Sequence, residues 1–377
     1  MRVTLTDATL ARHAGRFVWL ELNYDEEVNQ AFLHRHDVAW TPAFLILDPA
    51  DERVTAMQIG GMTVPEVVRF LDRGERGVRE RAAAPADAAL AKGAALAGRG
   101  RLAAAAASYR EALRIAGPDW PERTHAVDAL ISTLQAARDW QACAETAAAE
   151  APTLPREREL ASVVHVGLGC ANAGDAAPWA EAARKVLEPL APAAAALPTA
   201  LRDDRFEIYQ QMMVAAERRG AADDLARWGK VWLDEIDATT PASDDERSAL
   251  DIARVDAVSL LDDPARALPA LAASERAMPD NYTASARLAQ MSLYAQRYDD
   301  ALAACDRGLA HAPGAMGRTA LLMTAAHAWI GKGRPADALV ALDRALRSAR
   351  TIGDQGVRAG MVRSISNMIG ETKRSTP

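Results

Sequence analysis

Residues 288–313 read LAQMSLYAQRYDDALAACDRGLAHAP, and this stretch decides the fold of most of the chain. Within it, Ala301, Cys305 and Gly308 recur at a spacing of three or four residues, which places them on one face of a helix. Pro313 then ends the pattern, because proline cannot continue a helix. The stretch therefore predicts two helices joined by a short turn, with small side chains where the helices cross.

The same pattern returns at several places along the chain. Clear copies occupy residues 91–113 and 326–346, and Ala267 lies 34 residues before Ala301. Weaker copies include Trp140, Cys143, Ala147 and Pro155, then Trp179, Ala182, Val186 and Pro189, then residues 209–233, and then Ala267, Leu271 and Pro279. These copies resemble tetratricopeptide repeats, whose first helix has a small residue and an aromatic residue, and whose second helix has alanines and an aromatic residue and ends at a proline.

The resemblance to tetratricopeptide repeats implies an all-α solenoid over residues 88–370, followed by a polar tail over residues 371–377. One helix pair cannot bury its apolar face alone, so neighbouring pairs stack into a superhelix with a concave face. The resemblance implies that a polypeptide partner or client protein binds on this concave face.

The first part of the chain has a different pattern, and it predicts an α/β layer. Residues 17–23 are rich in strand formers, and residues 43–59 predict a hairpin that ends at a glycine pair. A helix is expected over Thr63–Arg73, with Thr63 as its cap. Residues 16–70 resemble the later part of the thioredoxin fold. We therefore expect a truncated or degenerate thioredoxin-like domain over residues 1–76, then a linker or helix extension over residues 77–87.

The thioredoxin resemblance also implies a candidate site for substrate or partner binding, formed by Thr41 and Pro42 with the neighbouring Trp40. In that family the proline of this step is cis, and the residue before it offers backbone hydrogen bonds to an extended substrate. The alternative is a trans proline in an ordinary turn. Trp40 is expected either to contact a partner or to fill a core, because tryptophan is amphipathic.

The cysteines limit what this domain can do. No cysteine precedes Cys143, so the Cys-x-x-Cys of thioredoxins is absent. Cys143, Cys170 and Cys305 are far apart and odd in number, and we expect each to be a buried free thiol rather than part of a disulfide or metal cluster. The sequence therefore predicts a redox-inactive binding adaptor or chaperone-like module. The alternative is a thiol-disulfide oxidoreductase whose Cys-x-x-Cys lies upstream of a misassigned start.

Charge and composition exclude several other classes. The net charge of −7 and the pI near 5.6 argue against nucleic-acid binding. The sequence contains no run of eighteen apolar residues, so no membrane span is expected. It also lacks the usual nucleotide, hydrolase and metalloprotease motifs, so no enzyme activity, cofactor or metal is expected. As written the chain is expected in the cytoplasm, or in the periplasm or outside the cell if the true start lies upstream.

Overall fold

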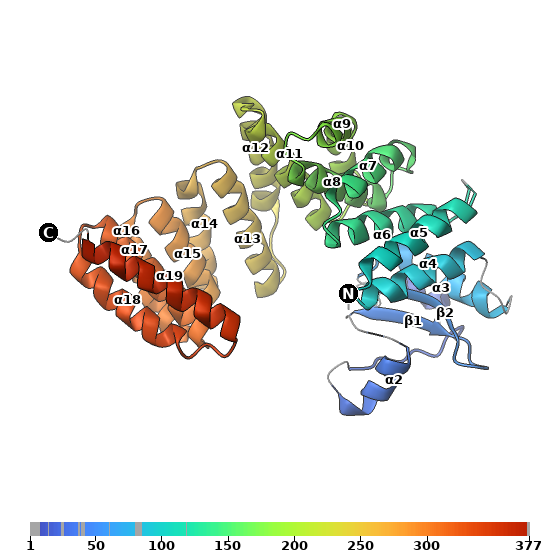
Figure 1. Cartoon of the computed structure of the whole chain (residues 1–377), viewed down its shortest axis with the longest axis horizontal. Helices are drawn as coiled ribbons and strands as arrows, with labels where there is room; N and C mark the ends of the chain where they lie inside the picture. Colours follow the sequence, from blue (N-terminus) through green and yellow to red (C-terminus); the bar gives the residue numbers. More distant parts are fainter. Residues whose placement is uncertain are drawn as a thin grey trace. The chain divides into compact units, whose positions relative to one another are not determined.

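The computed structural model describes residues 8–13, 15–23, 26–36, 38, 42–59, 61–79, 85–117 and 119–374. The described chain is mostly helical (Figure 1). It forms two compact units, Met1–Gln211 and Met212–Pro377, which we call unit 1 and unit 2. Among the described residues, no helix is both long enough and apolar enough to cross a membrane.

Unit 1 begins with short elements and a hairpin, and helices follow. Its elements are the 3₁₀ helices η1 (Ala8–His13) and η2 (Glu27–Asn29), α2 (Gln30–Arg35), β1 (Ala43–Leu47), β2 (Val54–Ile59), α3 (Val64–Arg79), α4 (Pro85–Gly98), α5 (Leu102–Ile115), α6 (Arg123–Ala136), α7 (Trp140–Glu150), η3 (Ala151–Thr153), α8 (Arg158–Ala173), α9 (Pro178–Leu187), η4 (Glu188–Leu190), α10 (Ala191–Ala195) and the first part of α11 (Arg202–Arg218).

Unit 2 consists of helices alone in the described residues. They are the rest of α11, then α12 (Ala222–Ala238), α13 (Asp244–Leu260), η5 (Pro264–Ala267), α14 (Leu268–Ala277), α15 (Tyr282–Tyr294), α16 (Tyr298–His311), α17 (Ala315–Gly331), α18 (Pro335–Ala349) and α19 (Gln355–Arg374).

The helices from α4 to α18 are arranged as helix pairs, which confirms the predicted helical repeat. The first helices of the pairs are α4, α6, α8, α11, α13, α15 and α17, and the second helices are α5, α7, α9, α12, α14, α16 and α18. A left-handed backbone residue lies in the turn inside every pair, at Gly100, Arg138, Asp175, Gly220, Asp262, Gln296 and Gly333. The turns therefore share one conformation although their sequences differ.

A common hydrogen bond explains this shared conformation. In six of these turns, the N–H that follows the left-handed residue donates to the carbonyl five residues earlier, which is the helix end known as the Schellman motif. The donor and acceptor pairs are Arg101 and Leu96, Asp139 and Leu134, Ala221 and Ala216, Asp263 and Val258, Arg297 and Ser292, and Arg334 and Trp329. The bond satisfies a carbonyl that the helix end would otherwise leave unpaired.

Small residues allow the two helices of a pair to approach closely. A Cβ atom at Gly93 in α4 would lie 2.5 Å from the Tyr109 ring of α5, its partner in the pair. The same holds between neighbouring pairs, where a Cβ atom at Gly331 in α17 would lie 2.4 Å from the Tyr298 ring of α16. Such distances are shorter than any normal carbon contact. Glycine at these positions therefore makes room for the aromatic ring, as the repeat pattern predicted.

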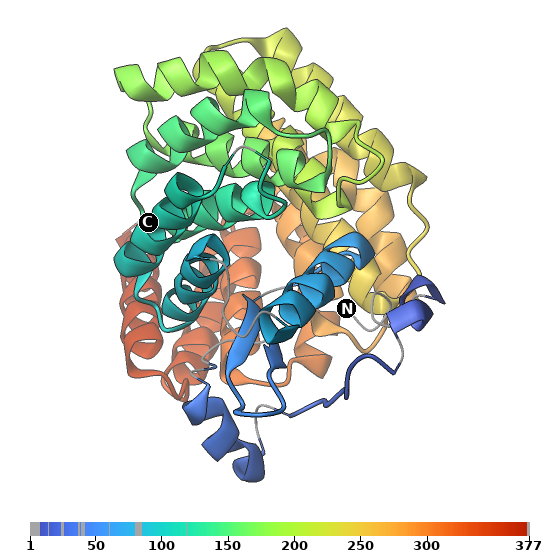
Figure 2. The ribbon, with the colours of Figure 1, turned by 90° about the vertical axis from the view of Figure 1, so that its right-hand side faces the viewer.

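The predicted hairpin is confirmed. β1 and β2 are antiparallel, with Ala43 opposite Ile59 and an irregularity between Ile46 and Leu47. α3 packs on the hairpin, and α4 contacts β2 (Figure 2). The buried core between hairpin and helix is made by the side chains of Leu10, Ile46, Ala56, Met62, Val67, Phe70 and Leu71.

The predicted strand over residues 17–23 is wrong. These residues have no ladder partner beyond a single bridge at Phe17, and the described sheet has only β1 and β2. Val18 is 89% exposed and Leu20 is 80% exposed, so neither belongs to a core. A strand needs a neighbour to accept and donate its backbone hydrogen bonds. A thioredoxin-like domain is therefore not shown, although the hairpin and α3 follow the expected order.

The prediction of three free cysteines is also wrong. Cys143 in α7 and Cys170 in α8 form a disulfide, with their Cα atoms 6.1 Å apart. The expected burial is correct, since both residues and Cys305 are fully buried. Spacing alone did not reveal the pair, because consecutive helices of stacked pairs bring residues 27 positions apart into contact.

Candidate functional site

The site expected from the thioredoxin resemblance can be followed only in part. Trp40 and Thr41 lie outside the residues that the structure describes. Pro42 is described, and it is half-buried directly before β1. The proposed backbone docking at Thr41-Pro42 therefore stays a prediction.

A second candidate lies on α3, which has two different faces. Val67 and Phe70 are buried against the hairpin. Glu66, Arg69 and Arg73 are spaced by three and four residues, so they lie together on another side of the helix. In the structure these three charged side chains contact the beginnings of the first helices α6 and α8.

Glu66 connects the start of α3 to α8. Its carboxylate accepts a hydrogen bond from Arg158, at 2.6 Å, and others from the backbone N–H and the hydroxyl of Thr63. Burial raises the pKa of Glu66, but Arg158 and Thr63 together lower it further, so the net pKa is below the usual value. Glu66 is therefore held as a carboxylate at neutral pH, where it complements the helix start.

Arg69 forms the second link to α8. It donates to Glu159 at 2.5 Å and lies 3.9 Å from Glu157. The Glu159 side chain is only 3% exposed, while that of Arg69 is one-third exposed. Burial raises the pKa of Glu159 more than Arg69 lowers it. A backbone N–H hydrogen bond and the charge of Arg69 therefore offset the burial of this carboxyl only in part.

Arg73 forms the most buried link. It donates to Glu122 at 2.7 Å, and the two side chains are 7% and 4% exposed. Its guanidinium also lies 5.5 Å from the centre of the Phe70 ring, in a cation–π contact. Glu122 precedes α6 as its N-cap residue, but its side chain makes no cap hydrogen bond and instead contacts Arg73 and, at 3.9 Å, Arg76.

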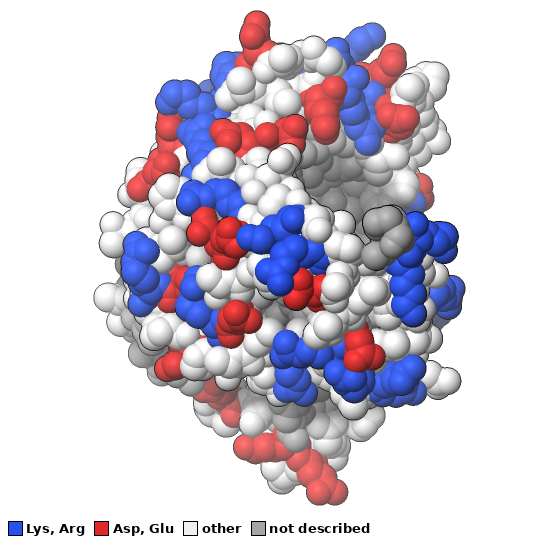
Figure 3. All heavy atoms as spheres, turned by 90° about the vertical axis from the view of Figure 1, so that its left-hand side faces the viewer, with Lys and Arg blue, Asp and Glu red and all other residues white. Residues whose placement is uncertain are grey.

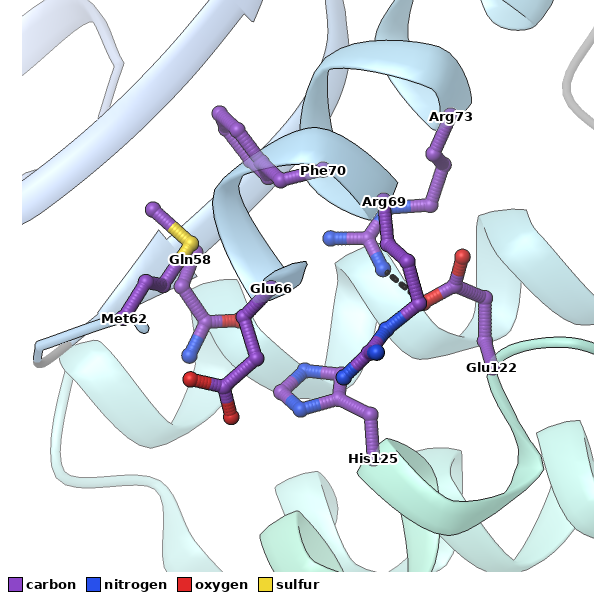
Figure 4. A pocket seen from close by; sticks show the side chains of 8 residues that line it. All are labelled: Gln58, Met62, Glu66, Arg69, Phe70, Arg73, Glu122 and His125. Atoms are coloured by element: carbon purple, nitrogen blue, oxygen red, sulfur yellow. Dashed lines mark hydrogen bonds and ion pairs between the residues drawn. The ribbon is translucent and has the colours of Figure 1, made fainter. Parts of the chain in front are cut away.

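These side chains surround a small cavity of about 20 Å³, shown in Figure 4. A cavity of this size holds about one water molecule, which excludes a small organic substrate. It is lined by Gln58, Met62, Glu66, Arg69, Phe70, Arg73, Glu122 and His125. Burial, followed by the charge of Arg73, lowers the pKa of His125 to about 4. His125 is therefore neutral at pH 7 and adds no positive charge beside the arginines.

The polar row continues along the first helices of unit 1. Asp128 on α6 accepts from the hydroxyl of Ser162 on α8, at 2.6 Å. Asp204 on α11 lies 3.4 Å from His165 and 3.5 Å from Arg158. Burial raises the pKa of Asp128 despite the hydrogen bond from Ser162. Polar side chains thus also join the first helices α6, α8 and α11 to one another, beside the pairs made with α3.

This row consists of ion pairs and hydrogen bonds between helices. In the described ranges, no group of three or more His, Cys, Asp or Glu side chains is placed to hold a metal ion. The strongest interactions are the charge-assisted hydrogen bonds of Glu66 with Arg158, Arg69 with Glu159 and Arg73 with Glu122, which join α3 to α6 and α8. On the face shown in Figure 3, Lys and Arg side chains are interspersed with Asp and Glu side chains.

Sequence reasoning identified Thr63 as the cap of this helix and did not single out Glu66, Arg69 or Arg73 as site residues. A signal was present, since residues 66, 69 and 73 repeat at helical spacing on the side away from the apolar residues. Their partners could not be found in the same way. Glu122 and Glu159 are 49 and 90 residues away from the arginines they bind.

No model of a known protein family matches the sequence, and a search of curated proteins finds no significant match. Among solved structures, the chain is similar to a tetratricopeptide repeat protein from Parabacteroides merdae, with 10% identity and a TM-score of 0.44; the match covers 75% of this chain and 99% of that one. It is also similar to the TPR2AB domain of yeast Sti1 in a complex with pHSP90, with 15% identity and a TM-score of 0.31, over 76% of this chain and 98% of that one.

Proposed function

We propose that this chain is a polypeptide-binding adaptor, in which the first helices of successive pairs form the binding surface. The observation that carries the proposal is the contact of α3 with α6 and α8 through the pairs Glu66–Arg158, Arg69–Glu159 and Arg73–Glu122. In this contact the repeats already hold one amphipathic helix, which belongs to the chain itself.

The physical basis is the geometry of stacked helix pairs. Each pair buries its apolar face against its neighbours, which leaves the outward side of the first helices as an extended surface. On α6 and α8 this surface carries Glu122, Arg158 and Glu159, so charges of both signs alternate along it. Alternating charges select a partner helix with the opposite order and penalise a helix in another register.

The test separates residues 1–79, which we call the N-terminal module, from the helix pairs that follow. A protease site is introduced within residues 80–84 of the full chain, and the chain is cleaved after folding. We expect the N-terminal fragment to stay bound to the repeats, with an affinity that falls as salt is raised. In an Arg69→Gln/Arg73→Gln chain cut at the same site, the dissociation constant of the fragment should be at least tenfold higher.

The matched control is Arg35→Gln, which removes an exposed ion pair between Arg35 and Glu52 inside the N-terminal module. Cleaved Arg35→Gln protein should retain its fragment as the parent chain does. The proposal is contradicted if the wild-type fragment separates on cleavage, or if the Arg69 and Arg73 substitutions leave its retention unchanged.

The thiol-disulfide oxidoreductase is the second candidate, and it has less support. It rests on the order of the hairpin, the glycine pair and α3, which resembles the later part of thioredoxin. Thiol exchange needs an accessible thiolate. Cys143 and Cys170 are buried in a disulfide, and burial raises the pKa of the Cys305 thiol to about 12. We expect no turnover in an insulin-reduction assay, and measurable turnover would favour this candidate.

A further inference from the structure

Unit 2 contains a second cavity, which lies between α16, α17 and α18. Its volume is about 140 Å³, against about 20 Å³ for the cavity beside α3. A cavity of about 150 Å³ is large enough to hold a benzene ring. Within the same compact unit, α17 packs on both α16 and α18, so the walls of the cavity are held together. The cavity can therefore take a phenyl ring or a branched aliphatic group from a ligand.

The floor of this cavity is apolar. Leu322 of α17 and Ala341 of α18 are 5% and 6% exposed and belong to the hydrophobic core of the last helices. Leu309 of α16 and Trp329 of α17 are half-buried and pack against that core. The guanidinium of Arg334 lies 4.5 Å from the centre of the Trp329 ring, in a cation–π contact. Core packing and this contact hold the floor in place, and the floor suits an apolar group.

The mouth of the cavity has an apolar side chain and a carboxylate that is already paired. Val340 on α18 lines the cavity and is 63% exposed, so its apolar surface is in contact with water. A ligand that covers Val340 gains the free energy of removing this surface from water. Asp337 also lines the cavity, but it forms an ion pair of 2.6 Å with Arg334. Asp337 is therefore not the group that selects a charged ligand.

Two further charges at the mouth have opposite signs and stand on different helices. Asp306 on α16 and Arg344 on α18 are exposed and line the same cavity. Neither side chain forms an ion pair or a hydrogen bond with a residue that the structure describes. By contrast, Asp343 and Arg347, which flank Arg344 on α18, pair with each other. The cavity thus has a carboxylate on one wall and a guanidinium on another, and both have room for a partner.

We propose that this cavity binds a free amino acid with an apolar side chain. The side chain occupies the floor beside Trp329, the ammonium group pairs with Asp306, and the carboxylate pairs with Arg344. The guanidinium group has the fork geometry that matches two carboxylate oxygens. Ligand sites of this kind combine an apolar lining with a few polar groups that fix orientation. A residue inside a polypeptide has neither terminal charge, so its side chain alone would leave Asp306 and Arg344 without partners.

The test uses the full chain and para-fluoro-L-phenylalanine, whose binding is followed by fluorine NMR. We expect saturable binding with a dissociation constant in the millimolar range or below. L-Phenylalanine and L-leucine should compete for the site. Glycine has both charges but no apolar side chain, so it should not compete.

Two analogues separate the contributions of the two charges. Para-fluorophenethylamine lacks the carboxylate and para-fluorophenylpropionate lacks the ammonium group, so each should bind at least threefold more weakly than the amino acid. Asp306→Asn should weaken binding of the amino acid and the amine, but not of the propionate. Arg344→Gln should weaken binding of the amino acid and the propionate, but not of the amine.

Asp343→Asn and Arg347→Gln are the matched controls, because both residues are exposed on α18 and lie outside the cavity lining. They should leave every affinity unchanged, and circular dichroism checks that all variants are folded. The proposal is overturned if the amino acid does not bind, or if the two analogues bind as tightly as it does. It is also overturned if Asp306→Asn and Arg344→Gln bind the amino acid as the wild type does.

A further probe distinguishes a free amino acid from a side chain within a polypeptide. N-acetyl-para-fluoro-L-phenylalaninamide carries the same ring and neither charge, so it should bind more weakly than the free amino acid. Equal or tighter binding of this neutral compound would overturn the amino-acid assignment and indicate a polypeptide ligand for the cavity.

The cavity adds a small-molecule ligand to the adaptor function and does not depend on that function. The cleavage experiment tests Arg69 and Arg73 in unit 1, whereas the titration tests Asp306 and Arg344 in unit 2. A retained N-terminal fragment together with a failed titration would leave the adaptor function standing and reject only the amino-acid site.

Discussion

Arg73 of α3 and Glu122 at the start of α6 form an ion pair of 2.7 Å in which both side chains are less than one-tenth exposed. Removal of Arg73 would leave the Glu122 carboxylate buried, with Arg76 at 3.9 Å as its remaining ion-pair partner among the described residues. We therefore expect Arg73→Met to lower the free energy of unfolding by about 3–5 kcal/mol, and Arg73→Met/Glu122→Leu to recover most of this loss. Urea unfolding monitored by circular dichroism measures both effects.

An exposed ion pair provides the comparison for Arg73. Arg35 and Glu52 lie 2.6 Å apart, but both side chains are more than 60% exposed. We expect Arg35→Met to change the free energy of unfolding by less than about 1 kcal/mol, because water and salt screen such pairs. A loss at Arg73 no larger than that at Arg35 would show that burial of the pair has no energetic importance.

The neutral state of His125 predicts a pH dependence of stability. Its pKa is about 4 in the folded chain and near 6.5 when unfolded. Between these values the unfolded chain binds more protons, so stability should fall as the pH is lowered from about 6.5 towards 4. His125→Asn should reduce this slope in urea-unfolding midpoints measured between pH 7 and pH 5. The same slope in both proteins would refute a neutral, half-buried His125.

The disulfide between Cys143 and Cys170 predicts both a thiol count and a stability. Protein folded under oxidising conditions and then denatured without reductant should show one free thiol, that of Cys305, and three after reduction. Because the bond joins residues 27 positions apart, we expect Cys143→Ala/Cys170→Ala to lower the free energy of unfolding by about 3 kcal/mol. Three free thiols without reductant would contradict the pairing.

The turns inside the helix pairs offer a stabilising substitution. Gln296 has φ of 58°, in the same turn position where another pair has Gly333 at φ of 67°. A side chain is strained in this conformation and glycine is not, so Gln296→Gly should stabilise the chain by about 0.5–1 kcal/mol. Gly333→Ala should destabilise it by a similar amount. Thermal unfolding of the two variants gives the test, and a lower midpoint for Gln296→Gly would contradict the turn assignment.

The helical repeat could be predicted because its causes are local. Small residues such as Ala301 and Gly308, at a spacing of three or four, set which face of a helix packs on its neighbour. The hairpin was predictable for the same reason, since strand formers flank a polar turn. The strand over residues 17–23 was predicted from the same kind of pattern and is absent, because a strand also needs a neighbour that the local sequence does not supply.

The candidate site could be predicted only in small part. Thr63 was identified as a helix cap, and the structure adds its hydrogen bonds to Glu66, which in turn pairs with Arg158, 92 residues away. The left-handed turn at Gly333 could be expected, because glycine favours a positive φ, whereas glutamine at position 296 gives no such indication. The hydrogen bond from the residue after each turn forms in both cases, so the shared fold imposes the conformation where the residue type does not favour it.

By itself, the sequence determined that this chain is a series of helix pairs preceded by a hairpin and a helix, because propensity and periodicity act over a few residues. Only the tertiary structure decided which charges meet and which cysteines pair. Pairs such as Arg73 with Glu122, or Cys143 with Cys170, depend on how successive helix pairs stack. Stacking depends on the complete set of packed side chains, and no single stretch of sequence contains that information.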